Sequence, residues 1–419
     1  MFRAASESFM ADIRTISISL EAAMAGLRER DKVARADLGG RLSSDVTMVE
    51  EDGVRRVDWE RFPEKLVLSV DDAPLIFKSF RQMDAVQSAF RMIPGSFLAL
   101  LVSQFDVLVG RILRAAFAAK PELMKTIEKR LHFVEVEVEA LLRKSYVEQF
   151  KWMEDRFGLV LRKDFGAWPV FVELTERRHL WVHTDGSVNR QYLTVCGREG
   201  VDIADVQVGT PLPVSPTYFR EALNCITETG VKLCFIIWRK LLPDELSDAD
   251  SMYNSVVYEC LETPNNALAF ELVSFWERYC AKFARETTRL MLLVNHCIVL
   301  RRQGKNAEVD QLLGKVDWRA KSPMFQLAER TLKRDFDACR RLMGEVGSKH
   351  DQLKASAYRD WPLFEELRKT AEFAAGFKGV FGVDFNDFIL RKPSTELQQQ
   401  TTDVPPSQAT PAVTLSSSG

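Results

Sequence analysis

The chain has 419 residues, of which 46% are hydrophobic and 28% are charged, and its formal net charge at pH 7 is -2. This length exceeds what a single hydrophobic core usually serves, so two or three domains are expected. The balanced charge excludes general attraction to nucleic acid through bulk charge, so any nucleic-acid contact must be local.

The cysteines indicate a reducing compartment. They are seven in number, widely spaced and without any Cys-x-x-Cys pair. Most lie in apolar stretches with helical spacing, which favours buried, reduced thiols over disulfides or a zinc site. The N-terminal stretch also lacks the basic-then-apolar layout of a signal peptide, so we expect a cytoplasmic protein. The cysteines are Cys196, Cys225, Cys234, Cys260, Cys280, Cys297 and Cys339.

Residues 1–90 predict one helix followed by a mixed, irregular segment. Within residues 8–34, apolar side chains recur at helical spacing. These positions are Ile13, Ile16, Leu20, Met24 and Leu27. From residue 39 to about residue 80, Gly, Pro and Asp alternate with short β-branched and aromatic runs, which is typical of turns with one or two short strands.

The best candidate for a membrane span is residues 97–117, FLALLVSQFDVLVGRILRAAF. It is interrupted by Gln104, Asp106, Arg111 and Arg114. Such polar interruptions favour a buried amphipathic helix, so no membrane contact is expected. Residues 94–96, Pro-Gly-Ser, are suited to cap this helix, and residues 98–118 should then lie in the core of an all-α domain.

Two further helices are expected next. Apolar positions keep helical spacing from residue 133 to Phe157, which predicts one long helix that Gly158 ends. After a short basic loop, Pro169 marks the first turn of a helix that continues to His183. Residues 184–186, Thr-Asp-Gly, supply the turn that follows it.

The C-terminal half predicts a second helical domain at residues 213–392. Three prolines between residues 211 and 216 indicate a linker before it. Residues 292–318 read as a helix, a turn at Gly304 and a second helix, in the manner of a tetratricopeptide-like hairpin, although the 34-residue repeat signature of that family is absent. Such an array can bind a protein partner. The last residues, 393–419, are rich in Ser, Thr, Gln and Pro, which predicts a disordered tail.

The segment ERRHLWVH, residues 176–183, concentrates ionisable side chains at the end of a helix, with two of the chain's five histidines. Three interpretations remain open. The charges can simply complement the helix dipole. His179 and His183, which share a face with Glu176, could hold a metal, although the His-Glu-x-x-His order is missing. Alternatively, a histidine and an arginine could carry out phosphodiester chemistry without a metal.

A resemblance to a known protein family favours the third interpretation, phosphodiester chemistry without a metal. Residues 178–183 have the order arginine, polar residue, three further residues and histidine, at a helix end followed by TDGSVNRQYL. This arrangement resembles the motif of HEPN domains, which are all-helical nucleotide-binding and ribonuclease modules. The preceding VEVEVEALLRKSYVEQFKWMEDRFGL resembles the long helix that precedes this motif in bacterial members. The resemblance covers residues 95–200, about a quarter of the chain, and implies a HEPN-like domain at residues 91–210.

The resemblance implies a metal-independent endoribonuclease without a cofactor, of the kind found in toxins and anti-phage defence effectors. Arg178 would hold the phosphate, His183 would do the acid-base work while the ribose 2'-OH attacks, and His179 matches the polar second position, where asparagine is commoner. Arg178 and His183 lie about 140° apart on a straight helix. HEPN domains typically dimerise, so a homodimer would pair Arg178 of one chain with His183 of the other. A catalytically silent dimer that binds nucleotides or scaffolds a complex is the alternative.

Four cations near the motif are candidates for gripping the RNA backbone. They are Arg177, Arg190, Lys163 and Arg162. Each could equally be a solvated surface charge. Asp185 and Asn189 are interpreted as turn-forming residues.

Overall fold

The computed structural model describes residues 1–42, 48–51, 54–57, 72–123, 131–263, 265–280 and 283–390. This part of the chain is all-α, as predicted, apart from one antiparallel hairpin of β1 (Met48–Glu51) and β2 (Val54–Val57), which accounts for the predicted short strands. The chain divides into two compact units, Met1–His296 and Cys297–Gly419. The predicted disordered tail lies outside the described residues.

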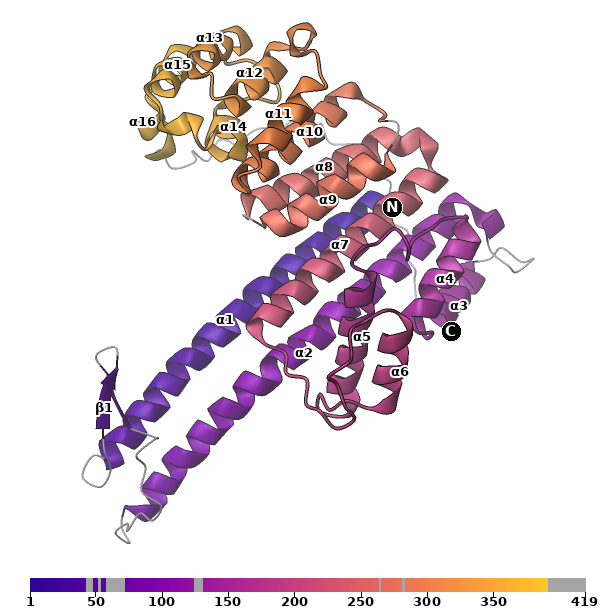
Figure 1. The fold of residues 1–419 in the computed structure, drawn as a ribbon, viewed down its shortest axis with the longest axis vertical. Coiled ribbons are helices and arrows are strands. Elements are labelled where there is room, and N and C mark those ends of the chain that lie inside the picture. Colours follow the sequence, from indigo (N-terminus) through magenta and orange to yellow (C-terminus); the bar gives the residue numbers. More distant parts are fainter. Residues whose placement is uncertain are drawn as a thin grey trace, which may run out of the picture. The chain divides into compact units, whose positions relative to one another are not determined.

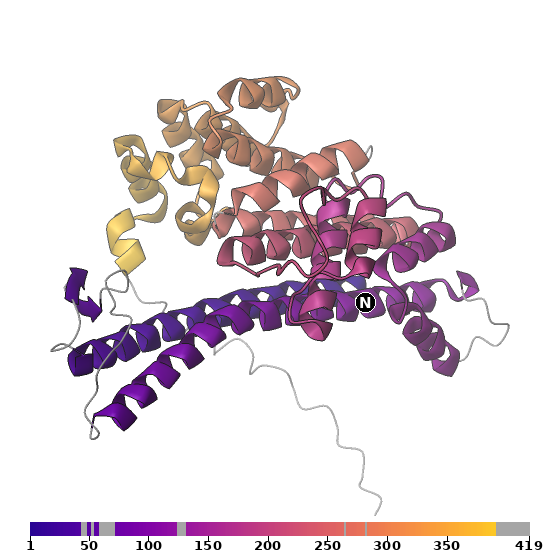
Figure 2. The same cartoon turned by 60° about the horizontal axis from the view of Figure 1, so that its bottom comes forward.

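Three long helices form the frame of the first unit and run side by side in Figures 1 and 2. They are α1 (Phe2–Leu42), α2 (Ala73–Ala119) and α7 (Pro216–Leu241). All five apolar positions predicted for the first helix are buried, because their spacing keeps them on one face of α1. The predicted linker and boundary near residues 211–216 fall inside this unit, since α7 packs along both α1 and α2.

The three long helices approach closely at Gly230. A Cβ atom at this position of α7 would lie 2.7 Å from the Phe9 ring of α1 and 2.8 Å from Leu108 of α2. Real Cβ atoms do not come this near, so glycine is required for the present spacing. The buried face of α2 continues through Leu101, Phe105 and Ile112, which confirms the prediction of a buried helix over residues 98–118.

Helix α2 differs from its predicted start. It passes through Pro94 without ending, so residues 94–96 are not a cap. The Ser96 hydroxyl instead donates back to the carbonyl of Met92 at 3.1 Å. Proline inside a helix costs about 3 kcal/mol, and packing against α1 on both sides of Pro94 offsets that cost. Among the described helices, only α2 is long and apolar enough to cross a membrane, and core helices of water-soluble proteins meet the same criterion.

The helix predicted from residue 133 to Phe157 is two helices, α3 (Leu131–Leu142) and α4 (Tyr146–Phe157). Ser145 caps α4 in a reciprocal capping box with Glu148, which satisfies two backbone N–H groups that a continuous helix would have used internally. The single-helix prediction was therefore wrong in this turn. Gly158 ends α4 at φ 61°, as predicted.

Across both units, all seven cysteines are buried and unbridged, as predicted. The first unit contains further helices. Its remaining helices are α5 (Trp168–His183), α6 (Arg190–Arg198), α8 (Leu246–Glu262), α9 (Asn266–Tyr279) and the first part of α10 (Glu286–Arg302).

The second unit contains most of the predicted helix, turn and helix over residues 292–318. The turn is Gly304 at φ 75°, a left-handed conformation that glycine adopts without strain. Further short helices follow, and α13 packs against both α12 and α15. They are α11 (Asn306–Gly314), α12 (Pro323–Leu332), α13 (Phe336–Val346), α14 (Ala355–Asp360), α15 (Ala371–Phe381) and α16 (Phe385–Leu390).

Candidate functional site

The segment ERRHLWVH forms the last two turns of α5, as predicted. The first half of this helix is held by an aromatic core, in which the Phe171 ring lies 4.9 Å from Phe105 of α2 and 5.5 Å from Phe150 of α4, centroid to centroid. Helix α5 ends at His183, where the N–H of Thr184 donates to the carbonyl of Leu180 at 2.7 Å. The packing of the first half fixes the position of the second half, of which only Val182 and His183 are exposed.

The turn after α5 is left-handed at two consecutive residues, with φ 49° at Asp185 and 77° at Gly186. This reverses the chain under Trp181, whose indole N–H donates to the carbonyl of Leu212 at 3.1 Å. Asn189 caps α6 by accepting from the N–H of Tyr192 at 2.9 Å. Asp185 and Asn189 therefore are turn and cap residues, as interpreted from the sequence.

The two histidines of the motif contact one another. The ring centroids of His179 and His183 lie 4.4 Å apart with the planes tilted by 51°. His183 is exposed and His179 is half-buried. Burial lowers the pKa of His179, and the nearby charges of His183 and Arg178 lower it further. The end of α5 thus carries two unlike imidazoles in contact, one of them open to solvent.

Arg178 points to a different neighbourhood, formed by Asp106 of α2 and Tyr146 of α4. The Tyr146 hydroxyl donates to Asp106 Oδ1 at 2.7 Å. Burial raises the pKa of Asp106, while the Tyr146 hydrogen bond and the Arg178 charge act against that rise. The Nε atom of Arg178 is buried without a hydrogen-bond partner. The guanidinium therefore keeps unused donor capacity beside a partly buried carboxylate.

Arg177 belongs to an internal network and not to an exposed groove. Its Nε donates to Glu173 Oε1 at 2.7 Å, and its guanidinium lies 4.0 Å from the centroid of the Tyr218 ring. Glu173 also accepts the hydroxyls of Tyr192 at 2.7 Å and Tyr218 at 2.6 Å. The side chains of Arg177 and Glu173 are only 15% and 12% exposed. These contacts give Arg177 a structural role, because its charge is already neutralised inside the fold.

The other predicted RNA-binding cations divide into two groups. Arg162 forms a salt bridge with Glu154 at 2.7 Å, so its charge is neutralised inside the fold, as that of Arg177 is. Lys163 is exposed but precedes the first turn of α5, which lies about 22 Å from His183 along the helix axis. Arg190 is exposed at the first turn of α6, just after the turn that follows His183. Only Arg190 is brought near the motif by the local chain path.

Metal ligation gains no support from this geometry. Across the ranges that the structure describes, no three His, Cys, Asp or Glu side chains come together as a group that could hold a metal ion. Glu176, which shares the helix face with the histidines, is half-buried, and burial raises its pKa. A raised pKa weakens its ability to act as a carboxylate ligand.

Asp106 and Tyr146 are the site residues that sequence reasoning missed. Asp106 carried a signal, since it is a carboxylate inside an otherwise apolar helix. Tyr146 gave no such signal in the sequence, because its spacing fits an ordinary core position.

Comparisons with protein-family models, with curated proteins and with solved structures found no match to this chain.

Proposed function

We propose that the chain is a metal-independent endoribonuclease of HEPN type, with Arg178, His179 and His183 at its catalytic site. The observation that carries the proposal is the contact between His179 and His183 at the open end of α5. The contact holds His183, the exposed ring, beside a second polar ring, and a neutral imidazole can take up and return the proton that phosphodiester cleavage moves.

The reaction balances without a metal. The His183 imidazole takes the proton of the ribose 2'-OH, and the 2' oxygen forms a bond to phosphorus. The bond from phosphorus to the 5' oxygen breaks, and the His183 imidazolium returns the proton to that leaving oxygen. Arg178 stabilises the charge on the phosphate oxygens. The products carry a 2',3'-cyclic phosphate and a 5'-OH.

The proposal includes a homodimer in which the motif helices of two copies face each other across a two-fold axis, so that Arg178 of one copy approaches His183 of the other. Arg190 would then grip the RNA backbone at the rim of the cleft. The C-terminal helical pairs are the proposed surface for a protein partner, as expected for a cytoplasmic toxin or defence effector.

Incubation of the purified protein with total RNA in EDTA tests the activity. We expect cleavage with cyclic phosphate ends, and loss of cleavage in His183→Ala and Arg178→Ala. Val182→Ala is the matched control, because Val182 is 52% exposed beside the motif and carries no proton. His179→Asn should keep much of the activity through hydrogen bonding. Undiminished cutting by His183→Ala, or complete loss of wild-type activity in EDTA, would contradict the mechanism.

One observation favours a second candidate, a silent HEPN dimer that binds nucleotides or RNA as a scaffold. The Nε atom of Arg178 is buried, and Arg177 and Arg162 are neutralised by carboxylates, so few cations remain to hold a substrate. Binding of RNA or nucleotide without any cleavage, abolished by Arg190→Ala, would establish this alternative.

A further inference from the structure

The guanidinium of Arg178 lies against the body of the first unit without bonding to it. Its Nε atom is buried, yet it forms no hydrogen bond. Arg178 also forms no salt bridge with any residue in the described ranges. The two terminal nitrogens lack a bonding partner there as well, but they are not enclosed. A buried donor without an acceptor is unfavourable, so another interaction holds this side chain inward.

The course of α5 shows what the guanidinium faces. Phe171 and Arg178 are seven residues apart and share one face of the helix. Long side chains on a helix lean towards its N-terminus, so Arg178 reaches back towards Phe171. The Tyr146 ring lies 5.6 Å from the Phe171 ring, centroid to centroid, and the Tyr146 hydroxyl donates to Asp106 Oδ1 at 2.7 Å. Burial raises the pKa of Asp106 and the charge of Arg178 opposes that rise, which agrees with this placement.

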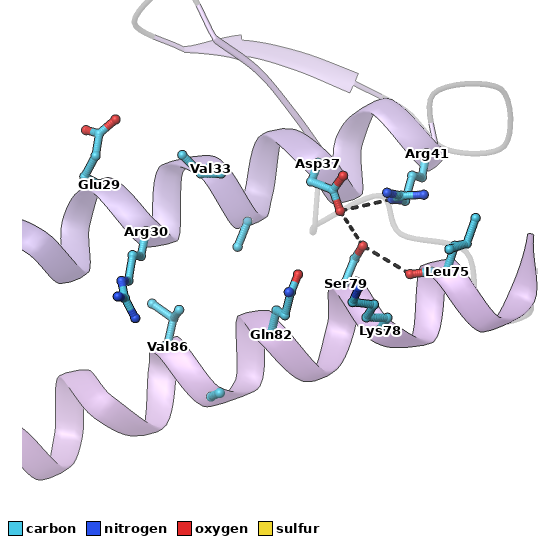
Figure 3. A pocket seen from close by; sticks show the side chains of 12 residues that line it. Glu29, Arg30, Val33, Asp37, Arg41, Leu75, Lys78, Ser79, Gln82 and Val86 are labelled. Atoms are coloured by element: carbon cyan, nitrogen blue, oxygen red, sulfur yellow. Dashed lines mark hydrogen bonds and ion pairs between the residues drawn. The ribbon is translucent and has the colours of Figure 1, made fainter.

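Another carboxylate on the long helices shows the closed form of such a cluster. Asp37 of α1 accepts from Arg41 Nε at 3.0 Å and from the Ser79 hydroxyl at 2.5 Å, as the dashed lines in Figure 3 indicate. An acid, a hydroxyl group and an arginine meet there, and the arginine donates its Nε–H to the acid. Around Asp106 the hydrogen bond from the hydroxyl is made, but none from the arginine is. The donors of the second arginine, Arg178, therefore stay unused.

We propose that Asp106, fixed by Tyr146, is a positioning residue for Arg178 in the ribonuclease site. The carboxylate attracts the guanidinium by charge and holds it in place. Because no hydrogen bond joins them, the terminal nitrogens are free to form a bidentate fork with two phosphate oxygens. Arg177, whose Nε donates to Glu173, would first have to break that bond. The inference rests on the proposed function, since a held and open guanidinium acts only on a phosphate ester that reaches it.

Steady-state cleavage by the full chain tests the proposal, on an RNA oligonucleotide that contains a site mapped in total RNA. Asp106→Asn keeps an oxygen that can accept from Tyr146 but removes the charge. We expect kcat to fall at least about tenfold and KM to change less than about twofold, because a preorganised guanidinium acts on charge that develops in the transition state. Asp37→Asn is the matched control, since it removes a carboxylate with partners of the same kinds and should leave both constants unchanged. Circular dichroism verifies that each variant is folded.

Tyr146→Phe tests the other half of the pair. The ring and its packing against Phe171 remain, and only the hydroxyl that fixes Asp106 is lost. The kcat should fall in the same direction as in Asp106→Asn but by a smaller factor, because the carboxylate charge is still present. Wild-type kcat in both variants, with RNA cleavage intact, would overturn the positioning role and leave the ribonuclease proposal standing.

A second measurement does not depend on cleavage. In an NMR spectrum of the isotope-labelled protein, the Nε–H signal of Arg178 is identified by its absence in Arg178→Lys. This proton should exchange slowly with water because Nε is buried. Asp106→Asn should speed the exchange at least about tenfold, and Asp37→Asn should not change it. Equal protection in Asp106→Asn would overturn the proposal whether or not the protein cuts RNA. If the exchange responds but the wild type never cuts RNA, the ribonuclease proposal fails and the hold of Asp106 on Arg178 is supported.

Discussion

The indole of Trp181 occupies the space where a side chain at residue 95 would lie. A Cβ atom built on Gly95 of α2 would come within 2.3 Å of Cε3 of Trp181, on the last turn of α5. Another part of the same indole, its Cε2 atom, would lie 3.0 Å from a Cβ atom built on Gly186. The Trp181 ring therefore packs closely against two glycines, and through Gly95 it joins the motif end of α5 to α2.

The first prediction concerns the close contact between Trp181 and Gly95. Gly95→Ala should lower the free energy of unfolding by about 1–3 kcal/mol, because overpacking must displace the Trp181 ring. Gly26→Ala is the control: no atom lies within 4 Å of the point where the methyl carbon of alanine would sit on this α1 glycine, so alanine there should stabilise the helix by about 0.5–1 kcal/mol. Urea denaturation measures both. Equal stability of the two variants would contradict the close contact.

The second prediction concerns Glu173 and Arg177. Glu173→Ala should destabilise the protein by about 3–5 kcal/mol, since it leaves a largely buried guanidinium without its carboxylate and two tyrosine hydroxyls without an acceptor. The exposed pair of Arg143 and Glu139 serves as the control, and Glu139→Ala should change stability by less than about 1 kcal/mol. A small effect of Glu173→Ala in thermal unfolding would restore Arg177 as a candidate RNA contact.

Much of the helical fold could be predicted because its apolar spacing is regular. The buried positions of α1, the core part of α2 and the limits of α5 all follow from that spacing. The break between α3 and α4 also left a trace, since Ser145 and Glu148 form the Ser-x-x-Glu signature of a capping box, but the continuous apolar pattern outweighed it. The passage of α2 through Pro94 could not be predicted, because it depends on the tertiary packing of α2 against α1, α5 and α7.

The candidate site was predictable only along α5. The helix end and its histidines follow from local sequence, and so does their four-residue spacing. The surroundings of Arg178 required the fold, because Asp106 and Tyr146 come from two other helices. Arg177 and Arg162 looked like free cations in the sequence, since their partners Glu173 and Glu154 are revealed only by side-chain geometry.

The third prediction concerns a buried ion pair inside α7. Lys232 is 1% exposed and hydrogen-bonds to Glu228, with its ammonium 4.7 Å from the centroid of the Phe275 ring. Lys232→Met should cost about 3–5 kcal/mol, because it leaves the Glu228 carboxylate buried and unpaired. The double variant Lys232→Met with Glu228→Gln should recover most of this loss. If the double variant is as unstable as the single one in urea denaturation, the pair does not act as a unit.

The last prediction concerns the protonation of His179. Because burial and the positive charges of His183 and Arg178 disfavour its imidazolium, His179 should titrate below the usual value of 6.5. The unfolded chain then binds the proton more readily than the folded one, so the contribution of His179 to stability is present above pH 6.5 and is lost as the pH falls through its folded pKa. His183→Ala removes one of the two charges, so the pKa of His179 should rise, but only part of the way, because burial remains. An NMR titration of the imidazole protons measures this shift, with Val182→Ala as the control that leaves both rings in place. A pKa of His179 at or above 6.5, or one unchanged by His183→Ala, would show that the two rings do not interact in solution.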